Sequence, residues 1–297
     1  MDDTRPGVPV TVRIGQIKQP YGGYLKGTDF VKTKLGPGIE ELYPDENIPP
    51  QIIGAVVDYL TKFMIGVPVN RSFPSRQVTK VIDKQLGNDN YYFDQAIKYE
   101  KTISKRGRTN GLSNKSIITA IKLAVLAFTS TYIESMDPNE HTIENVRTMV
   151  TRSLNLFDKY GVGDIETDLT FDGGYTNVVS NGNLDFKTDD TILDIHVLKT
   201  ERLDKRYTLQ VLMYWILGLN SYEWAIYPEI KYLAVYNPRF NILYRIETSK
   251  ISKDTIKAVE NDVLCLSSGF AESIYPYLRD VKPITSAEDI TCTKYKK

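Results

Sequence analysis

A small set of polar residues in the second half of the chain has the types and spacing that metal-assisted chemistry needs. Asp185 and Asp194 each lie in a short apolar run of strand type, and His196 follows Asp194 at position i+2. Side chains two apart in a strand share one face. Gln210 and Tyr214 stand four apart in a segment of helical spacing and share a helix face. Two carboxylates on neighbouring strands suffice to hold Mg²⁺, which prefers oxygen ligands and keeps several waters.

The order of these residues resembles the PD-(D/E)xK nuclease superfamily, especially its RecB-like branch. In that family two acids bind Mg²⁺, a lysine two residues after the second acid positions the attacking water, and a helix carries a QxxxY element. The resemblance implies that Asp185 and Asp194 are the metal ligands. It assigns Gln210 and Tyr214 to the QxxxY element. It also implies a further glutamate from the preceding helix, for which Glu144 is the candidate by position.

The sequence departs from the family at the lysine, where His196 stands. An unperturbed imidazole is mostly neutral at neutral pH and prefers softer metals than Mg²⁺. Lys199 has an odd offset from Asp194, which points it to the other face unless a bulge intervenes. Lys205 or Arg206, at the start of the following helix, could supply from another position the positive charge that the family's lysine provides. The site is therefore expected to be either vestigial, with no cofactor, or active with Mg²⁺.

Each of these residues taken singly also has an ordinary structural interpretation. The two aspartates are common types at turns and strand edges, and a lone histidine is more often a satisfied core residue than a ligand. Leu209, Leu212, Met213 and Ile216 already form a core stripe on the helix that carries Gln and Tyr. The ordered set is thus more informative than any of its members.

Longer stretches of the chain resemble a family of phage and prophage proteins. The length, the two-part organisation and the altered nuclease core are also similar to the phage anti-defence proteins that inhibit the Gabija system. This resemblance implies a homo-oligomer in the host cytoplasm that encloses a bacterial defence nuclease and blocks its access to DNA. The similarity is carried by IKQPYGGYL, ENIPPQIIGAVVDYLTKFM, FDGGYT, NLDFKTDDTILD, TLQVLMYWILG and YNPRFN.

The charges of the chain balance in total but not locally. The 37 basic and 37 acidic side chains give no net charge, which argues against a general preference for nucleic acid or membrane. The segment 98–122 nevertheless holds seven basic residues against Glu100, and 164–194 holds eight acids against Lys187. The basic segment predicts either a solvated face or a patch for phosphate or for an acidic protein surface.

Candidate partner-binding residues come from this basic segment and from the glycine-rich start of the chain. The chain has 20 tyrosines, whose large apolar area and polar tip suit protein interfaces as well as cores. A bacterial defence nuclease is the partner that we expect, with DNA as the alternative. The residues expected to contact it are Lys101, Lys105, Arg106, Arg108, Tyr21 and Tyr24.

The remaining composition predicts a cytoplasmic protein with no membrane partner. No apolar run approaches the roughly 20 residues of a membrane-spanning helix, and the first ten residues lack the pattern of a signal peptide. Two cysteines, Cys265 and Cys292, with two histidines make a structural zinc site improbable. A disulfide between the cysteines is compatible with the sequence but not required.

Local periodicity predicts the elements that position these residues. Proline and glycine punctuate residues 1–45, and the apolar alternation at Val10, Val12 and Ile14 indicates at most short strands in an extended arm. Helical spacing with start and stop signals covers 47–66. Further helices are expected over 113–135, 142–160 (Thr142 as N-cap, Gly161 as stop) and 207–219, with strands within 165–200 and over 231–236 and 242–247.

The order of these elements predicts an α/β fold with a mixed β-sheet flanked by helices. This α/β domain should span 141–297. A mainly helical module over 46–140 and the arm over 1–45 should precede it. Whether the helical module packs as an independent domain is left open by the sequence.

Overall fold

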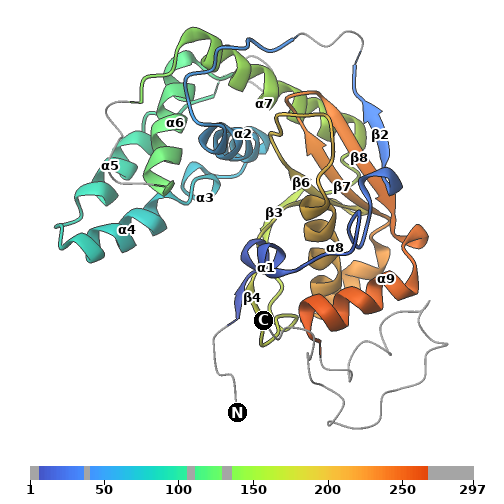
Figure 1. The fold of residues 1–297 in the computed structure, drawn as a ribbon. Helices are drawn as coiled ribbons and strands as arrows, with labels where there is room; N and C mark the ends of the chain where they lie inside the picture. The colour runs from blue at the N-terminus through green and yellow to red at the C-terminus, as the bar shows by residue number, and fades with distance from the viewer. Residues whose placement is uncertain (1–6, 37–40, 106–110, 129–135, 267–297) are drawn as a thin grey trace.

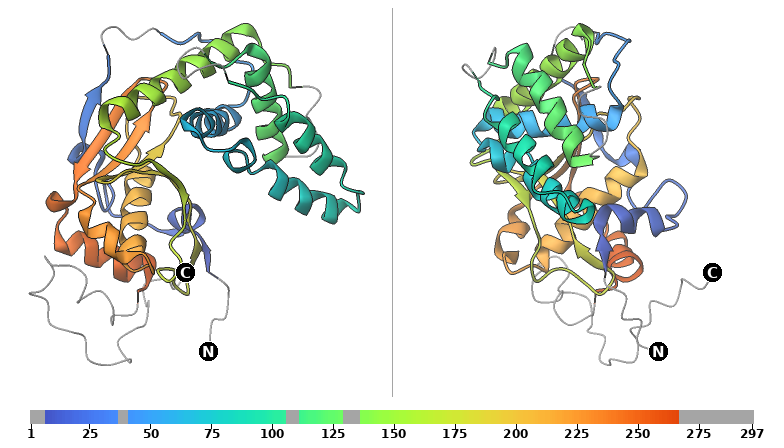
Figure 2. Two further views of the ribbon diagram at one scale, coloured as in Figure 1. Left: turned by 180° about the vertical axis from the view of Figure 1, so that it is seen from behind. Right: turned by 90° about the vertical axis from the view of Figure 1, so that its left-hand side faces the viewer.

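A computed structural model of the chain describes residues 7–36, 41–105, 111–128 and 136–266. Figure 1 shows an arch with a group of helices on one side and a β-sheet with its own helices on the other. The long helix α7 (Glu140–Tyr160) runs across the top and joins the two sides. Figure 2 shows the same arch from behind and from the side. Of the sequence predictions, those on Arg106, Arg108 and Cys292 lie outside the described residues.

The central sheet has six strands and is mixed, as the sequence predicted. Strands β6 (Thr191–Ile195) and β7 (Tyr232–Asn237) are parallel, and the remaining neighbours are antiparallel. A second, two-stranded parallel sheet pairs β1 (Val8–Pro9) with β4 (Val179–Asn181). From one edge to the other, the strands of the central sheet are β2 (Val31–Lys34), β8 (Ile242–Glu247), β7 (Tyr232–Asn237), β6 (Thr191–Ile195), β5 (Leu184–Lys187) and β3 (Glu166–Leu169).

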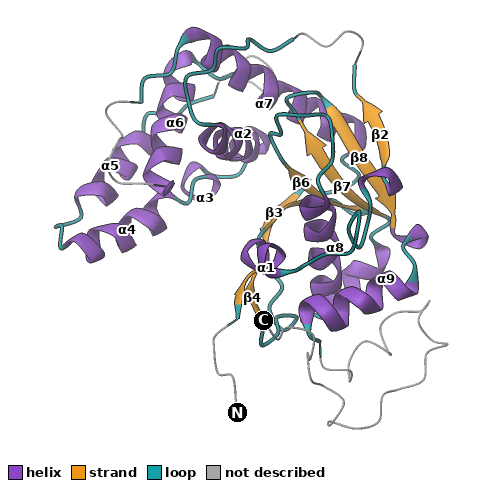
Figure 3. Ribbon diagram, viewed as in Figure 1, coloured by secondary structure: helices purple, strands orange, loops and turns teal. Residues whose placement is uncertain are grey.

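Helices cover both faces of this sheet (Figure 3). The connection from β6 to its parallel neighbour β7 runs through α8 (Lys205–Leu219), which is buried along nearly its whole length. On that face Ile192, Leu233 and Val235 belong to the core that contains residues of α8, α1 (Val10–Gln16) and α9 (Lys253–Ala258). On the opposite face the end of α7 contributes Leu156 and Phe157, which pack with Phe186, Leu193, Ile195, Ala234 and Tyr236.

The helical side of the arch has a hydrophobic core of its own. Its longest member, α2 (Pro50–Ile65), starts at a proline and has Gly66 as its C-cap, with φ +118°, a conformation that side chains disfavour. None of the described helices is long and apolar enough to cross a bilayer. The helices of this module are α2 (Pro50–Ile65), α3 (Val69–Ser72), α4 (Ser75–Leu86), α5 (Tyr91–Glu100) and α6 (Asn114–Phe128).

The start of the chain differs from the prediction of an extended arm. Val10 to Gln16 form helix α1, not a strand, because Val10 and Ile14 are one helical turn apart and both bury against the core around α8. Strand β2 then joins the sheet as its edge, paired with β8. Residues at the beginning of the chain are therefore part of the α/β core.

The later predicted elements agree closely with the structure. Helix α7 ends at Gly161 as expected, although its N-cap is Asn139, whose side chain accepts a hydrogen bond from the Thr142 backbone N–H. Strands β7 and β8 and helix α8 lie where periodicity placed them. The predicted helix over 113–135 is found as α6, and the part beyond Phe128 is outside the described residues.

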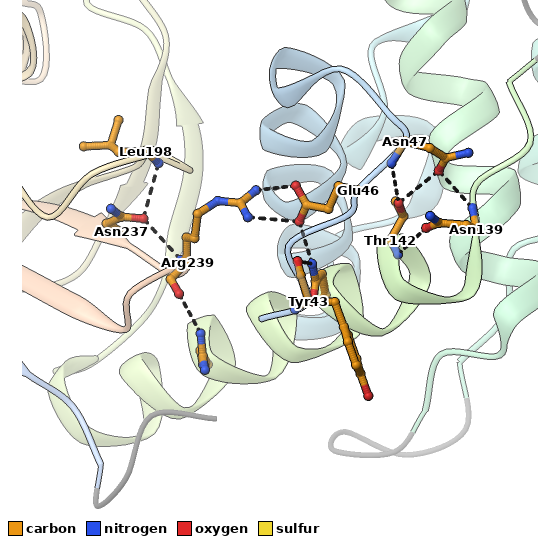
Figure 4. A network of polar contacts seen from close by, with 10 residues as sticks. Tyr43, Glu46, Asn47, Asn139, Thr142, Leu198, Asn237 and Arg239 are labelled. Atoms are coloured by element: carbon orange, nitrogen blue, oxygen red, sulfur yellow. Dashed lines mark hydrogen bonds and ion pairs between the residues drawn. The ribbon is translucent and has the colours of Figure 1, made fainter. Parts of the chain in front are cut away.

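A polar network fixes the segment before α2 to both sides of the arch (Figure 4). Arg239 lies in the turn between β7 and β8, and its guanidinium donates two hydrogen bonds to Glu46, at 3.0 and 2.7 Å. Asn47 accepts from the Thr142 hydroxyl and from the Asn139 backbone N–H on the α7 side. Arg152 of α7 donates to the carbonyl of Arg239, so α7 is also bonded to the turn that carries Arg239.

Candidate functional site

The structure brings a lysine of the helical module into the predicted acidic site. Lys62 lies on α2, and its side chain is only 2% exposed. Its Nζ lies 2.8 Å from Asp58 Oδ2, one helical turn earlier, and 2.6 Å from Asp168 Oδ1 on β3. The same Nζ lies 3.9 Å from Asp185 Oδ1 on β5. A buried ammonium group therefore joins the helical module to Asp185, one of the predicted metal ligands.

The two predicted metal ligands, Asp185 and Asp194, lie side by side where β5 and β6 separate. Regular pairing ends at Phe186, opposite Leu193. Beyond it the two strands are joined by hydrogen bonds from backbone to side chain. Asp194 Oδ1 accepts from the Asp185 N–H at 3.3 Å, and Asp185 Oδ2 accepts from the Ile195 N–H at 3.0 Å. These bonds hold one oxygen of each carboxylate in place. They leave the other oxygens, Oδ1 of Asp185 and Oδ2 of Asp194, to face the site.

Burial and neighbouring charges shift the pKa values of the groups in the site. Burial, together with Asp58 and Asp194, raises the pKa of Asp185 well above its usual range. Burial also raises the pKa of Asp58, against the opposing effect of Lys62. For Lys62 itself burial acts in the lowering direction, but Asp58, Asp185 and Asp168 outweigh it and raise its pKa. The lysine is therefore charged at neutral pH, whereas the carboxyl groups of Asp58 and Asp185 resist ionisation in the metal-free fold.

His196 lies at the end of β6, next to Asp194. Its Nε2 lies 3.6 Å from Asp194 Oδ2, and its ring packs on Tyr207 with centroids 4.1 Å apart. Within the described part of the chain, neither Nε2 nor Asp194 Oδ2 has a hydrogen-bond partner, although both atoms are buried. The structure thus places His196 beside the second acid, as the strand spacing predicted.

Gln210 and Tyr214 face the same site from α8. Gln210 Nε2 donates to the Tyr214 hydroxyl at 3.1 Å, and the Tyr214 ring stacks on Phe171 at 5.4 Å. Burial, then the charges of Asp194 and Asp185, raise the pKa of Tyr214 well above its ordinary value. Tyr214 is therefore a neutral hydroxyl at physiological pH, positioned near the two aspartates.

The other predicted site residues are not brought to this centre. Glu144 lies on α7 with its side chain 47% exposed and pairs with Arg147, whose guanidinium donates to the Leu112 carbonyl of the helical module. Lys199 is exposed beyond β6, and Lys205 is exposed at the start of α8. Arg206 pairs with Asp204, the N-cap of α8. The positive charge that lies beside Asp185 in the described structure belongs to Lys62, not to Lys199, Lys205 or Arg206.

Sequence reasoning missed Lys62, Asp58 and Asp168. The signal available was an acid and a lysine at i and i+4 in a helix that is otherwise mostly apolar. Such a pair is usually a solvated surface contact, so it does not by itself indicate a buried site. Asp168 has φ +56°, a conformation uncommon for aspartate, and its Oδ1 also accepts from Asn183 Nδ2 at 3.1 Å.

The predicted partner-binding residues occupy two separate places. Tyr21 is fully exposed, whereas Tyr24 is half-buried against the core around α8. Lys101 is exposed after α5. Lys105 donates to the Phe63 carbonyl at 2.7 Å, and its Nζ lies 4.9 Å from the centre of the Phe63 ring. Lys105 therefore lies next to the residue that follows Lys62.

The carboxylates fit a divalent cation, although the described residues do not enclose one. Among them, no group of three or more His, Cys, Asp and Glu side chains is arranged to hold a metal ion. Mg²⁺ commonly takes only one or two carboxylates and completes its shell with water and phosphate. Asp194 Oδ2 is a buried acceptor with no hydrogen bond within the described structure. A cation held by Asp185 and Asp194 would satisfy that oxygen and favour the ionised form of Asp185.

Comparisons of the chain with protein-family models, with curated proteins and with solved structures find no match.

Proposed function

We propose that the chain is a metal-dependent nuclease with a PD-(D/E)xK-like core whose lysine has moved from the strand to helix α2. The observation that carries the proposal is the place of Lys62. Its buried Nζ lies 3.9 Å from Asp185 and 2.6 Å from Asp168, so a fixed positive charge lies beside one of the predicted metal ligands, Asp185. The histidine at position 196 then no longer argues against catalysis.

In this proposal Asp185 and Asp194 hold Mg²⁺, which when bound polarises a phosphate and lowers the pKa of a bound water. Lys62 stabilises the negative charge that develops on the phosphate, because its ammonium group is buried and permanently charged. The hydrogen bond from Gln210 fixes the Tyr214 hydroxyl, which orients a neutral donor toward the acidic centre. Catalysis then relies on preorganised charge more than on a titrating base.

DNA is the substrate that we propose, because a basic stretch lies on the module that supplies Lys62. Exposed Lys98, Lys101 and Lys105 belong to this stretch, and Lys105 contacts the C-terminal end of α2. Lysines that neutralise backbone phosphates provide most of the affinity for nucleic acid without sequence preference. The same helical module would thus bind the phosphate backbone and donate the lysine of the site.

Cleavage assays test this proposal. Purified protein is incubated with linear and supercoiled DNA in the presence of Mg²⁺ or Mn²⁺. We expect cleavage by the wild type, and at least a roughly hundredfold loss in Asp194→Asn and in Lys62→Met, the usual scale for removing one group that stabilises transition-state charge. Lys250→Met, an exposed lysine on η3 (Thr248–Lys250), is the matched control and should retain full activity. A wild type that leaves both DNA forms intact with either ion would refute the nuclease proposal.

A second function is favoured by the way Lys62 is held. Its ammonium group already donates to Asp58 and Asp168, and the raised pKa of Asp185 opposes the doubly ionised carboxylate pair that Mg²⁺ needs. These features support a non-catalytic site. The resemblance of the sequence to phage anti-defence proteins then supplies the function: a phage-encoded protein that binds and inhibits a bacterial defence nuclease of the Gabija type. The chain would act as a homo-oligomer and block the access of that nuclease to DNA.

Phage plating on cells that carry a Gabija system distinguishes the two functions. An inhibitor should restore plating when it is expressed, and Asp185→Ala or Asp194→Ala should leave that effect nearly intact. Charge reversal at Lys101 and Lys105, or Tyr21→Ala, should weaken it. Loss of the effect in the aspartate variants, with folding unchanged by circular dichroism, would contradict the inhibitor function.

A further inference from the structure

The ammonium group of Lys62 has more donors than its neighbours use. An ammonium group carries three N–H donors. Two of them donate to carboxyl oxygens, at 2.8 Å to Asp58 Oδ2 and at 2.6 Å to Asp168 Oδ1. Asp185 Oδ1 lies 3.9 Å from the same nitrogen, beyond the reach of a normal hydrogen bond. Within the described residues the third N–H therefore has no hydrogen-bond acceptor, although the lysine side chain is only 2% exposed.

Asp168 contacts Lys62 from an uncommon backbone conformation. The residues on either side of it in β3 pair regularly with β5. Asp168 itself has φ +56°, in the left-handed region that residues other than glycine seldom adopt. Its Oδ1 also accepts a hydrogen bond from Asn183 Nδ2 at 3.1 Å. Backbone outliers of this kind cluster at functional sites, and this one occurs at the strand residue that holds the lysine.

Asp58 contacts the lysine from the same helix, one turn earlier. Its side chain is 13% exposed, and its Oδ2 accepts from the ammonium group. Its other oxygen, Oδ1, is buried and has no hydrogen bond within the described structure. A carboxyl group with one unsatisfied oxygen is costly to bury, so the packing of α2 does not explain an acid at this position. The contact with Lys62 does explain it.

We propose that Asp58 and Asp168 are positioning residues, which fix the Lys62 ammonium group and leave its third N–H for the phosphate of the substrate. The inference rests on the proposed nuclease function, and it names two further residues on which the reaction depends. A lysine is a compact charge on a flexible four-carbon stem, so the groups that it contacts set its position. A charge that is fixed before the reaction stabilises the transition state without reorganisation.

This role differs in a measurable way from a contribution to stability alone. Positioning residues act through Lys62, so their substitution should have little effect once the lysine is absent. A loss of folded protein would instead lower the cleavage rate by the same factor with and without the lysine. Double-mutant cycles on the cleavage rate therefore separate the two roles.

The cycles combine Asp168→Ala or Asp58→Ala with Lys62→Met. Single-turnover cleavage of linear DNA in Mg²⁺ is measured over a range of enzyme concentrations, which gives the maximal rate and the half-saturating concentration separately. Asp168→Asn keeps a side-chain oxygen as acceptor and serves as the conservative variant. Circular dichroism checks the folding of each protein. Glu247→Ala and Lys250→Met form the matched control pair, an exposed carboxylate and lysine outside the site.

With Lys62 present, we expect Asp168→Ala and Asp58→Ala each to lower the maximal rate about tenfold or more, since a displacement of about 1 Å can cost a hundredfold. The half-saturating concentration should stay within about twofold, because binding of the ground state is unchanged. Asp168→Asn should recover most of the rate. In Lys62→Met the same alanine substitutions should lower the rate by less than about threefold. The control pair should leave both quantities unchanged.

Equal losses from the aspartate substitutions with and without Lys62 would overturn the inference and leave the nuclease proposal standing. A wild type that leaves the DNA intact would refute both. An NMR experiment tests the positioning without cleavage. The ammonium signal of Lys62, identified by its absence in Lys62→Met, should exchange slowly with water in the wild type and faster in Asp168→Asn and Asp168→Ala. An unchanged exchange rate in both Asp168 variants would contradict the inference.

Discussion

Lys62 of α2 and Asp168 of β3 form a 2.6 Å ion pair between the helical module and the sheet. The lysine side chain is almost fully buried, whereas the aspartate is partly exposed. Such a pair contributes little net stability compared with apolar packing, but the loss of one partner leaves an uncompensated buried charge. The contact therefore makes the geometry of the candidate site dependent on how α2 packs against the sheet.

Replacement of Lys62 should destabilise the fold through its carboxylate neighbours. We expect Lys62→Met to lower the free energy of unfolding by about 3–5 kcal/mol, because Asp58 and Asp168 lose their buried cation. Adding Asp58→Asn should recover part of this loss, since it removes one of the carboxylates. Urea denaturation measures both effects. Lys250→Met should stay within about 0.5 kcal/mol of the wild type, and an equal effect at both lysines would contradict the burial argument.

Asp185 should make the metal-free protein less stable as the pH rises. Its pKa is raised in the folded state, so at a pH above the unfolded value of about 3.9 the folded protein binds the extra proton. The contribution of this proton is fully present below the unfolded pKa and is lost as the pH passes through the folded pKa. The free energy of unfolding of the wild type minus that of Asp185→Asn, measured in chelator, should therefore fall over this window. A difference that rises with pH would show that Asp185 is ionised in the fold.

A divalent cation should stabilise the folded protein by mass action. At a concentration 100 times its dissociation constant, a ligand that binds only the folded state adds about 2.7 kcal/mol. We expect Mg²⁺ to raise the melting temperature of the wild type, and the rise to grow with pH as Asp185 becomes ionised. Asp194→Asn should remove the effect. Glu144→Gln should retain it, because Glu144 pairs with Arg147 on α7; a loss there would place the glutamate at the metal after all.

The Glu46–Arg239 pair should stabilise the contact between the segment before α2 and the turn between β7 and β8. Both side chains are mostly buried, and the guanidinium donates two hydrogen bonds to the carboxylate. Arg239→Lys should lose about 2 kcal/mol of stability, because a lysine cannot reproduce the planar two-bond geometry. A double-mutant cycle with Glu46→Gln measures the coupling. Additive effects of the two substitutions would show that the pair contributes no interaction energy.

The acids of the site and its helix could be anticipated because they belong to regular local patterns. Asp194 and His196 share a strand face, and Gln210 and Tyr214 share a helix face, as their spacing requires. Glu144 shows the limit of this reasoning. Its position before the strands matched the family pattern, but α7 directs its side chain toward Arg147. A position in chain order does not specify which way a helix faces.

Local sequence by itself predicted the ends of α2, α7, α8, β7 and β8 to within three residues, because hydrogen-bond patterns, caps and apolar periodicity act between residues close in the chain. Only the tertiary structure decided that Val10 to Gln16 bury as a helix against the α8 core and that β2 completes the sheet. It also decided that Lys62 joins Asp168 and Asp185. The physical reason is that a short-range ion pair depends on the packing of whole elements, and the spacing of residues along α2 carries no information about the strands it meets.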